Sequence, residues 1–446
     1  MATIWAAALD TLSRLLWGWH VLLLILAVGG YYTWTTGFYQ LRCAGRWLKA
    51  ALCRPAGETG KLSSFQALST ALAGSIGTGN IVGVAAAITV GGPGALFWMW
   101  ASALLGMMTI YAENALAARY RTPGASGALG YIQRAGKWGK PLAALYAGGC
   151  CMASLGMGNM AQTHAAAAAL NSLGVAPWVA AVCLGVFVFV VARGGLTVGA
   201  KIAQGLVPAM TLLFFGASLG VLWVFRENLP AAFASIFQGA FSWKAGAGGT
   251  VGALLAMREG VSRGVFTNEA GLGSSAFAYD GVEGRSPEEL GCLGIFQVFA
   301  DTIVMCTVTG LCILCCRSPM LEGAALTFYA YEAALGPWGG KAVSLCTALF
   351  ALATLTAWSC YGREGLCYLT GGRGKGVYAL TAAVAAGLGC FLPLGTVFQL
   401  GDAMNGLMAL PNLLALFCLG SQLSHRESFP RKILKTAGIF RGLMIK

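Results

Sequence analysis

The sequence predicts an all-α polytopic membrane protein with about eleven transmembrane helices. Hydrophobic residues make up 57% of the 446 residues and charged residues only 10%, which is not the composition of a soluble globular domain. Apolar runs of about 20 residues, the length that crosses a bilayer as a helix, recur along the chain. The predicted spans are residues 14–36, 64–90, 93–118, 141–169, 176–194, 200–226, 245–278, 292–316, 341–362, 376–393 and 396–422.

The net charge of +13 comes from basic residues that are distributed unevenly over the predicted loops. If the N-terminus lies outside, most of the 29 Lys and Arg residues fall in cytoplasmic segments, which is the positive-inside pattern. The sequence therefore predicts a multi-pass protein of the cell (inner or plasma) membrane, with the N-terminus outside and the C-terminus cytoplasmic. The basic residues mark the cytoplasmic side of the protein and are expected to contact the anionic headgroups of the lipid bilayer. No nucleic-acid partner is therefore needed to explain the positive charge, and none is expected.

Short loops and the lack of a linker predict one transmembrane domain over residues 1–446. The first span is too long for a signal peptide and is expected to remain as a peripheral helix. Residues 37–63 carry apolar side chains at helical spacing among basic ones, which predicts an amphipathic helix on the inner surface, and residues 227–244 are expected to do the same outside. The predicted parts are a peripheral helix with its amphipathic segment (14–63), a first repeat (64–226), a second repeat (245–422) and a basic cytoplasmic tail (423–446).

The segment GSIGTGN, residues 74–80, interrupts the second predicted span. Each glycine weakens a helix by roughly 1 kcal/mol relative to alanine, and this segment holds three of them. A break at bilayer depth frees backbone amides and carbonyls, so it is tolerated where it lines a cavity. Amides attract an anionic group and carbonyls a cation, so the segment predicts a binding site for a solute and a cation rather than a packing kink.

A second interrupted segment lies five spans later. Residues 248–280 begin apolar and then carry charged and polar side chains among glycines, from Arg258 to Glu269. Two interrupted segments in corresponding positions of two halves predict an inverted repeat with the binding site between them. The alternative is a loop with a re-entrant end.

Polar residues inside other spans are further candidates. In the fourth span Asn159 and Gln162 share a helix face, which indicates either a substrate contact or hydrogen bonds between helices. In the ninth span the Thr354 hydroxyl is suited either to completing an oxygen shell for sodium or to bonding back to its own helix, and Trp358 is suited to walling the pocket.

Three acidic residues stand out in the apolar background. Asp301 lies in mid-span, where a buried carboxylate is costly and points to a function, the alternative being a structural pair with Arg263 or another basic residue. Glu113 and Asp402 lie near predicted span ends, which allows an interfacial position. The fifteen cysteines are scattered and are expected to be packing residues, and three histidines predict no multi-histidine metal site.

Several motifs resemble those of the alanine or glycine:cation symporter family, the sodium:alanine symporters. They are FQALSTALAGSIGTGNIVGVA, GGPGALFWMW, GMGNMAQ, GVSRGVFTNEAGLGS, DTIVMCTVTGL and DAMNGLMALPNLLAL, in this order over about residues 60–420. The resemblance implies a secondary active transporter that imports small neutral amino acids, alanine or glycine, coupled to sodium by alternating access. It also implies the five-plus-five inverted repeat of the leucine-transporter type with an extra N-terminal helix.

The resemblance also implies the residues of the site. The amides of Thr78 and Gly79 would hold the substrate carboxylate, and the co-transported sodium ion would be held by carbonyls of Ala73 and Ile76 with the Thr354 hydroxyl. The other substrate-binding residues that it implies are Gly77, Asn80, Gln162, Gly264 and Trp358. The family usually carries two adjacent hydroxyl residues on the helix of Thr354, whereas Ala353 precedes Thr354 here.

Two other classes of function compete with a sodium symporter. An enzyme would need paired carboxylates or a histidine-rich metal site, neither of which is evident, so no enzyme is expected. A proton-coupled or uncoupled facilitator, or a channel, for small amino acids on the same scaffold remains the alternative. The sequence predicts no particular oligomeric state, which is unknown from these patterns.

Overall fold

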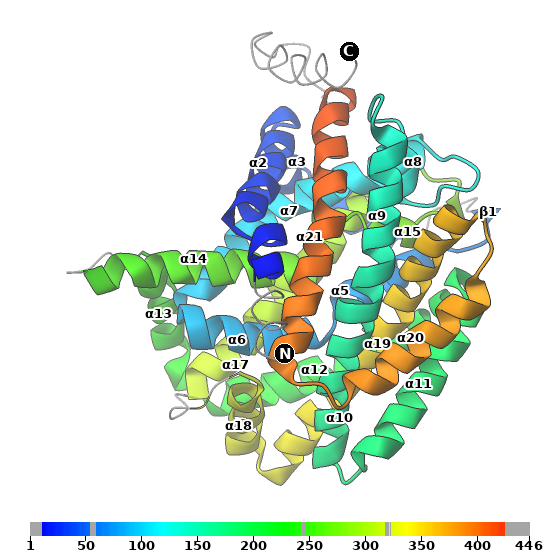
Figure 1. Cartoon of the computed structure of the whole chain (residues 1–446). Helices are drawn as coiled ribbons and strands as arrows, with labels where there is room; N and C mark the ends of the chain where they lie inside the picture. The colour runs from blue at the N-terminus through cyan, green and yellow to red at the C-terminus, as the bar shows by residue number, and fades with distance from the viewer. Residues whose placement is uncertain (1–10, 54–58, 242–246, 317–320, 322, 424–446) are drawn as a thin grey trace.

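Long apolar helices account for most of the computed structural model, which describes residues 11–53, 59–241, 247–316, 321 and 323–423. Figure 1 shows them packed side by side, with α14 (Ala247–Asn268) lying across the direction of α21 (Leu394–Leu419). The all-α polytopic prediction is therefore confirmed.

Within the described residues, eight helical stretches are long and apolar enough to cross a membrane. They are Thr11–Thr35, Gly94–Arg119, Gly139–Ser172, Pro177–Gly194, Leu196–Val224, Pro287–Cys316, Pro337–Thr370 and Gly395–Leu419. Three further predicted spans, 64–90, 245–278 and 376–393, contain helices that do not meet this length and hydropathy requirement within the described residues. The count of eleven is thus not established.

The longer helices and their continuations follow in chain order. They are α2 (Trp19–Thr35), α5 (Ser64–Ser75), α6 (Val82–Gly91), α7 (Gly94–Arg119), α9 (Gly139–Ala153) with η2 (Ser154–Met160) and α10 (Ala161–Ser172), α11 (Pro177–Gly194), α12 (Leu196–Val224), α16 (Pro287–Val298) with η4 (Phe299–Cys306) and α17 (Thr307–Cys316), α19 (Pro337–Thr370) and α20 (Lys375–Gly389).

Short elements connect the long helices. They are α3 (Tyr39–Arg42), α4 (Ala44–Leu52), β1 (Thr59–Gly60), η1 (Thr78–Asn80), α8 (Ala128–Ile132), η3 (Arg226–Asn228), α13 (Leu229–Phe241), α15 (Ser275–Ala278), β2 (Val282–Glu283), α18 (Ala324–Leu335) and η5 (Gly420–Gln422). Helices α3, α4 and α13 lie within the two predicted amphipathic segments. Strands β1 and β2 pair antiparallel and join the approach to α5 to the chain after α15, a contact that was not predicted.

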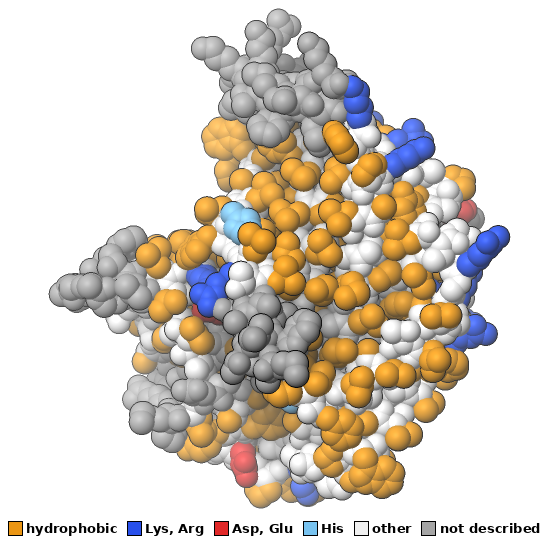
Figure 2. Space-filling view, viewed as in Figure 1, with side chains coloured by type: hydrophobic (Ala, Val, Ile, Leu, Met, Phe, Trp, Pro, Cys, Tyr) orange, Lys and Arg blue, Asp and Glu red, His pale blue; other side chains and the backbone are white. Residues whose placement is uncertain are grey.

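The outer surface is suited to lipid. Figure 2 shows hydrophobic side chains over much of the visible face, with most of the visible Lys and Arg near its upper and right edges. Helices α11 and α20 expose large apolar side chains, including Trp178, Val182, Val186, Val377 and Leu380. Their spacing of three or four residues gives each helix one apolar outer face, as a bilayer requires.

Candidate functional site

The first interrupted segment is a break in the helix. Helix α5 ends at Ser75, Gly77 has an extended backbone (φ −131°, ψ −161°), and α6 resumes at Val82. Every residue from 74 to 82 is buried. The predicted break of residues 74–80 is therefore present, and its backbone polar groups need partners inside the protein.

The donors of the break converge on two side-chain oxygens. The Gly77 amide donates to Asn80 Oδ1 at 2.9 Å, so Asn80 caps the turn. The Thr78 amide and the Thr78 hydroxyl both donate to Gln162 Oε1, at 3.2 and 2.9 Å. One oxygen atom thus satisfies two donors of the break.

Gln162 owes its position to an irregular stretch of its span. The chain forms a π-helical turn over η2 just before it, and Gly158 in this turn packs so closely on Trp358 that a Cβ there would lie 2.4 Å from Trp358 Cβ. The Gln162 amide nitrogen donates to Met157 O at 3.3 Å, which leaves the oxygen to face Thr78. π-helical turns are rare and recur at functional sites, and this one was not predicted.

Thr354 of α19 lies against the break. A Cβ added to Gly77 would be 2.3 Å from Thr354 Oγ1 and 3.3 Å from Gln162 Oε1, so only glycine fits at position 77 without a shift. The Thr354 hydroxyl donates to Phe350 O at 3.2 Å, which is the helix back-bond foreseen as its alternative role. Ala73 is fully buried in the last turn of α5, and Ile76 is the C-cap residue that follows the helix.

Asp301 also contacts the break. Asn80 Nδ2 donates to Asp301 Oδ1 at 2.8 Å and to Asp301 O at 3.1 Å, and the Thr302 hydroxyl donates to Oδ2 at 2.7 Å. Arg263 instead lies 3.9 Å from both Glu259 and Asp402. The pairing of Asp301 with Arg263 is therefore wrong, because Arg263 meets two other carboxylates.

The second interrupted segment turns through residues 269–274 after α14. Gly271 and Gly273 have positive φ (97° and 69°), and both amides donate to Glu113 Oε1, at 2.9 and 3.0 Å. Asn412 Nδ2 donates to the same oxygen at 2.7 Å. Glu113 is fully buried and holds this loop, so its side chain faces the protein interior.

The two interrupted segments are in contact with each other, but one predicted substrate-binding residue, Gly264, lies away from this contact. A Cβ on Gly79 would be 2.7 Å from Thr267 Cγ2, which brings η1 against the end of α14. The indole of Trp358 donates to Glu269 Oε1 at 2.6 Å. Gly264 faces α7 instead, where a Cβ would lie 2.5 Å from Ser102 Oγ.

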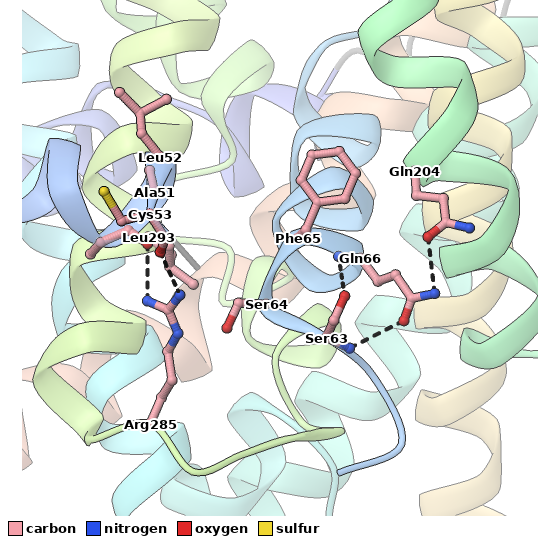
Figure 3. A pocket seen from close by; sticks show the side chains of 11 residues that line it. Ala51, Leu52, Cys53, Ser63, Ser64, Phe65, Gln66, Gln204, Arg285 and Leu293 are labelled. Atoms are coloured by element: carbon pink, nitrogen blue, oxygen red, sulfur yellow. Dashed lines mark hydrogen bonds between the residues drawn. The ribbon is translucent and has the colours of Figure 1, made fainter. Parts of the chain in front are cut away.

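A separate cavity of about 550 Å³ lies at the other end of α5, about 18 Å along the helix from the break. Figure 3 shows Ser63 and Gln66 capping the N-terminus of α5, and Arg285 reaching the chain near Cys53. Gln66 Nε2 donates to Gln204 Oε1 at 3.0 Å. The cavity lies beside the amphipathic helix α4 and does not include the residues of the break.

Comparison with known proteins identifies the family. The family model for the sodium:alanine symporter family matches residues 1–429. The chain belongs to this family. The resemblance of the motifs is thus confirmed, and the protein is an amino-acid:cation symporter, a transporter rather than an enzyme.

Three relatives within the sodium:alanine symporter family match over most of their length. Sodium/alanine symporter AgcS of Methanococcus maripaludis is 38% identical over 438 residues, which cover 94% of this chain and 96% of the relative. Probable sodium/glutamine symporter GlnT of Bacillus subtilis is 31% identical over 420 residues, covering 91% and 87%. Putative sodium/proton-dependent alanine carrier protein YrbD of the same organism is 31% identical over 435 residues, covering 92% and 89%.

Proposed function

We propose that this symporter imports a small neutral amino acid, alanine or glycine, together with sodium by alternating access. In this proposal one domain of two inverted five-helix repeats, residues 64–226 and 245–422, follows a peripheral N-terminal helix. The N-terminus is outside and the basic loops and C-terminus are cytoplasmic.

The observation that carries the proposal is the convergence of two Thr78 donors on one oxygen of Gln162. A substrate carboxylate that displaces this amide oxygen would accept the same two bonds, now charge-assisted and roughly twice as strong. The Gly79 amide, one residue on, is the next donor available to such a carboxylate, and the displaced Gln162 amide would face the substrate.

The same break supplies oxygens for a cation. Helix α5 ends at Ser75, so the carbonyls of Ala73 and Ile76 lie at its open end, where partial negative charge gathers. The Thr354 hydroxyl lies against the neighbouring Gly77. Sodium held by these three groups would balance the substrate carboxylate, and each charge moved with it gains roughly 2.3 kcal/mol per 100 mV.

Close packing favours a small substrate. Gly77 and Gly79 each face a side chain at a distance that leaves no room for one extra carbon atom. Relatives are named for alanine and for glutamine, so the family admits different side chains. Alanine and glycine fit the tight surroundings of this break better than glutamine does.

Proton coupling is the second candidate. One relative is named as sodium/proton-dependent, and Asp301 is a buried carboxylate two hydrogen bonds from the Gly77 amide. In this candidate a proton that binds the Asp301 carboxylate would neutralise its negative charge. In the sodium symporter the bound sodium ion would supply the compensating positive charge instead.

Uptake into proteoliposomes tests the proposal. Purified protein is reconstituted, and labelled alanine uptake is measured with an inward sodium gradient, with choline in place of sodium, and with an inward proton gradient alone. We expect sodium-driven accumulation that glycine competes with and glutamine does not. Equal uptake in sodium and choline would exclude sodium coupling, and accumulation driven by the proton gradient alone would favour the second candidate.

A further inference from the structure

Glu269 is a buried carboxylate to which the proposed function assigns no part. It follows the last residue of α14, is 1% exposed, and has a left-handed backbone (φ 62°) that glycine adopts more easily. Its side chain takes no part in the ion pairs among the described residues. A costly residue in a strained position needs compensating contacts.

Both carboxylate oxygens of Glu269 accept a hydrogen bond. Oε1 accepts the indole N–H of Trp358 at 2.6 Å, and Oε2 accepts the Ser274 hydroxyl at 2.5 Å. Ser274 belongs to the same interrupted segment, whereas Trp358 belongs to α19, 89 residues away in sequence. The carboxylate therefore fastens the second interrupted segment to α19.

Trp358 lies one helical turn from Thr354. Residues four apart on a helix share a face, so α19 presents Thr354 to Gly77 and Trp358 to Glu269. The other side of Trp358 is also fixed, because Gly158 packs on its Cβ and the Ser154 hydroxyl donates to its carbonyl at 2.7 Å. Loss of the indole bond would leave this turn of α19 held from one side alone, by Gly158 and Ser154, with Thr354 one turn away.

We propose that Glu269 is the positioning residue of the sodium site. By binding the Trp358 indole it sets the place of α19 between the two interrupted segments, and so holds the Thr354 hydroxyl at the first one. The inference rests on the proposed role of Thr354 in sodium binding. Glu269 itself touches neither the sodium ion nor the substrate in this account.

Three variants distinguish a positioning role of the Glu269 side chain from an effect of its ionisable carboxyl group. Glu269→Ala removes both bonds, and Trp358→Phe removes only the indole donor while it keeps an aromatic ring. Glu269→Gln removes the charge but keeps an oxygen for the indole, and its amide is able to donate to the Ser274 hydroxyl. Trp98→Phe is the matched control, because Trp98 Nε1 makes no hydrogen bond within the described part of the chain.

Two quantities are measured for each variant. The first is the sodium concentration for half-maximal alanine uptake, and the second is the alanine KM at saturating sodium. We expect Glu269→Ala and Trp358→Phe each to raise that sodium concentration up to about fivefold, as far as loss of the Thr354 hydroxyl itself would, and the double variant to raise it no further, since both remove the same bond. Glu269→Gln and Trp98→Phe should stay within about twofold of the wild type, and in the two impaired variants the alanine KM should change less than the sodium requirement.

Two results would overturn the inference. A folded Trp358→Phe protein with an unchanged sodium requirement would mean that the bond to Glu269 does not set the site. A Glu269→Gln protein as impaired as Glu269→Ala would mean that the charge itself acts. Failure of the proposed function is a separate result, because the wild type would then show no sodium dependence at all.

If Glu269→Ala does not give monodisperse, folded protein, Trp358→Phe and Glu269→Gln decide the matter, because Glu269→Gln keeps the side-chain shape and Trp358→Phe keeps an aromatic ring.

Discussion

The two interrupted segments are held in different ways. At the first, a neutral amide oxygen of Gln162 accepts the Thr78 donors, and the carboxylate of Asp301 acts only through Asn80. At the second, Glu113 binds backbone amides directly and Glu269 binds an indole and a hydroxyl. The first segment is thus held by an amide oxygen and the second by carboxyl groups.

This difference separates an exchangeable site from a fixed one. A typical hydrogen bond contributes about 1 kcal/mol net, whereas a buried donor left without an acceptor costs about 1–3 kcal/mol. In the proposed function a substrate carboxylate takes over the two Thr78 donors from Gln162, whereas release of the loop from Glu113 would leave three buried donors without an acceptor. The first segment is suited to bind and release, and the second to hold its shape.

The largest expected effect is loss of the anchor at the second segment. Glu113→Ala leaves the amides of Gly271 and Gly273 and the Asn412 side chain without their acceptor, so the free energy of unfolding should fall by at least about 3 kcal/mol, since each buried unsatisfied donor costs about 1–3 kcal/mol. Thermal and denaturant unfolding in detergent micelles measure it. Glu332→Ala, an exposed glutamate on α18, is the control and should change stability by less than about 0.5 kcal/mol. Equal stability of the two variants would remove Glu113 as an anchor.

The next effect concerns the first segment. Gly77→Ala places a Cβ 2.3 Å from the Thr354 hydroxyl, and relieving this clash should cost about 1–3 kcal/mol, up to a hundredfold in uptake. Gly83→Ala in α6 is the control, since nothing lies within 4 Å of its added Cβ, and transport should be retained. Alanine binding to the folded Gly77→Ala protein at wild-type affinity would show that the break is not the site.

The sequence was sufficient to predict features that local composition determines. Three glycines in GSIGTGN cannot form a stable helix, and the break lies there. Basic and apolar residues at helical spacing predicted the helices α3 and α4, and the motifs predicted the family. The 12-residue helix α18 was missed because it is too short to be recognised as a span.

The partners of the buried carboxylates were not predictable from single segments. Asn80 and Asp301 are 221 residues apart, and Glu113 and Asn412 are 299 apart, so only the packed bundle brings them together. One signal for Glu113 was available: the glycines of GLGS predict free amides that need an acceptor, and no other glutamate lies within the predicted third span. The π-helical turns η2 and η4 leave no comparable mark in the sequence.

Asp301 tests whether the first segment needs a charge. Asp301→Asn keeps an oxygen for Asn80 and loses the charge, whereas Asp301→Ala loses both. If Asp301 acts as a simple acceptor, alanine affinity should fall about tenfold in Asp301→Ala and about threefold or less in Asp301→Asn, as expected for the loss of one buried hydrogen bond. Isothermal titration of alanine in saturating sodium measures both. Equal loss in the two variants would mean that the carboxyl group itself is required, and the first segment would then depend on a carboxyl group as the second does.

The smallest effect is expected from a change at Thr354. This α19 residue lies against the first segment, and Trp358, one helical turn away, contacts the second. Thr354→Ala removes the hydroxyl that lies against Gly77, so the sodium concentration for half-maximal uptake should rise about fivefold, the loss of one neutral oxygen contact. Thr354→Ser keeps the hydroxyl, which also remains able to bond back to Phe350, and should stay within about twofold. Stability should be nearly equal in the two, because the back-bond stabilises the helix little. If the Thr354→Ala protein is well folded and its sodium response is unchanged, the hydroxyl bonds only within its own helix. The cation must then be held by the break without a ligand from α19.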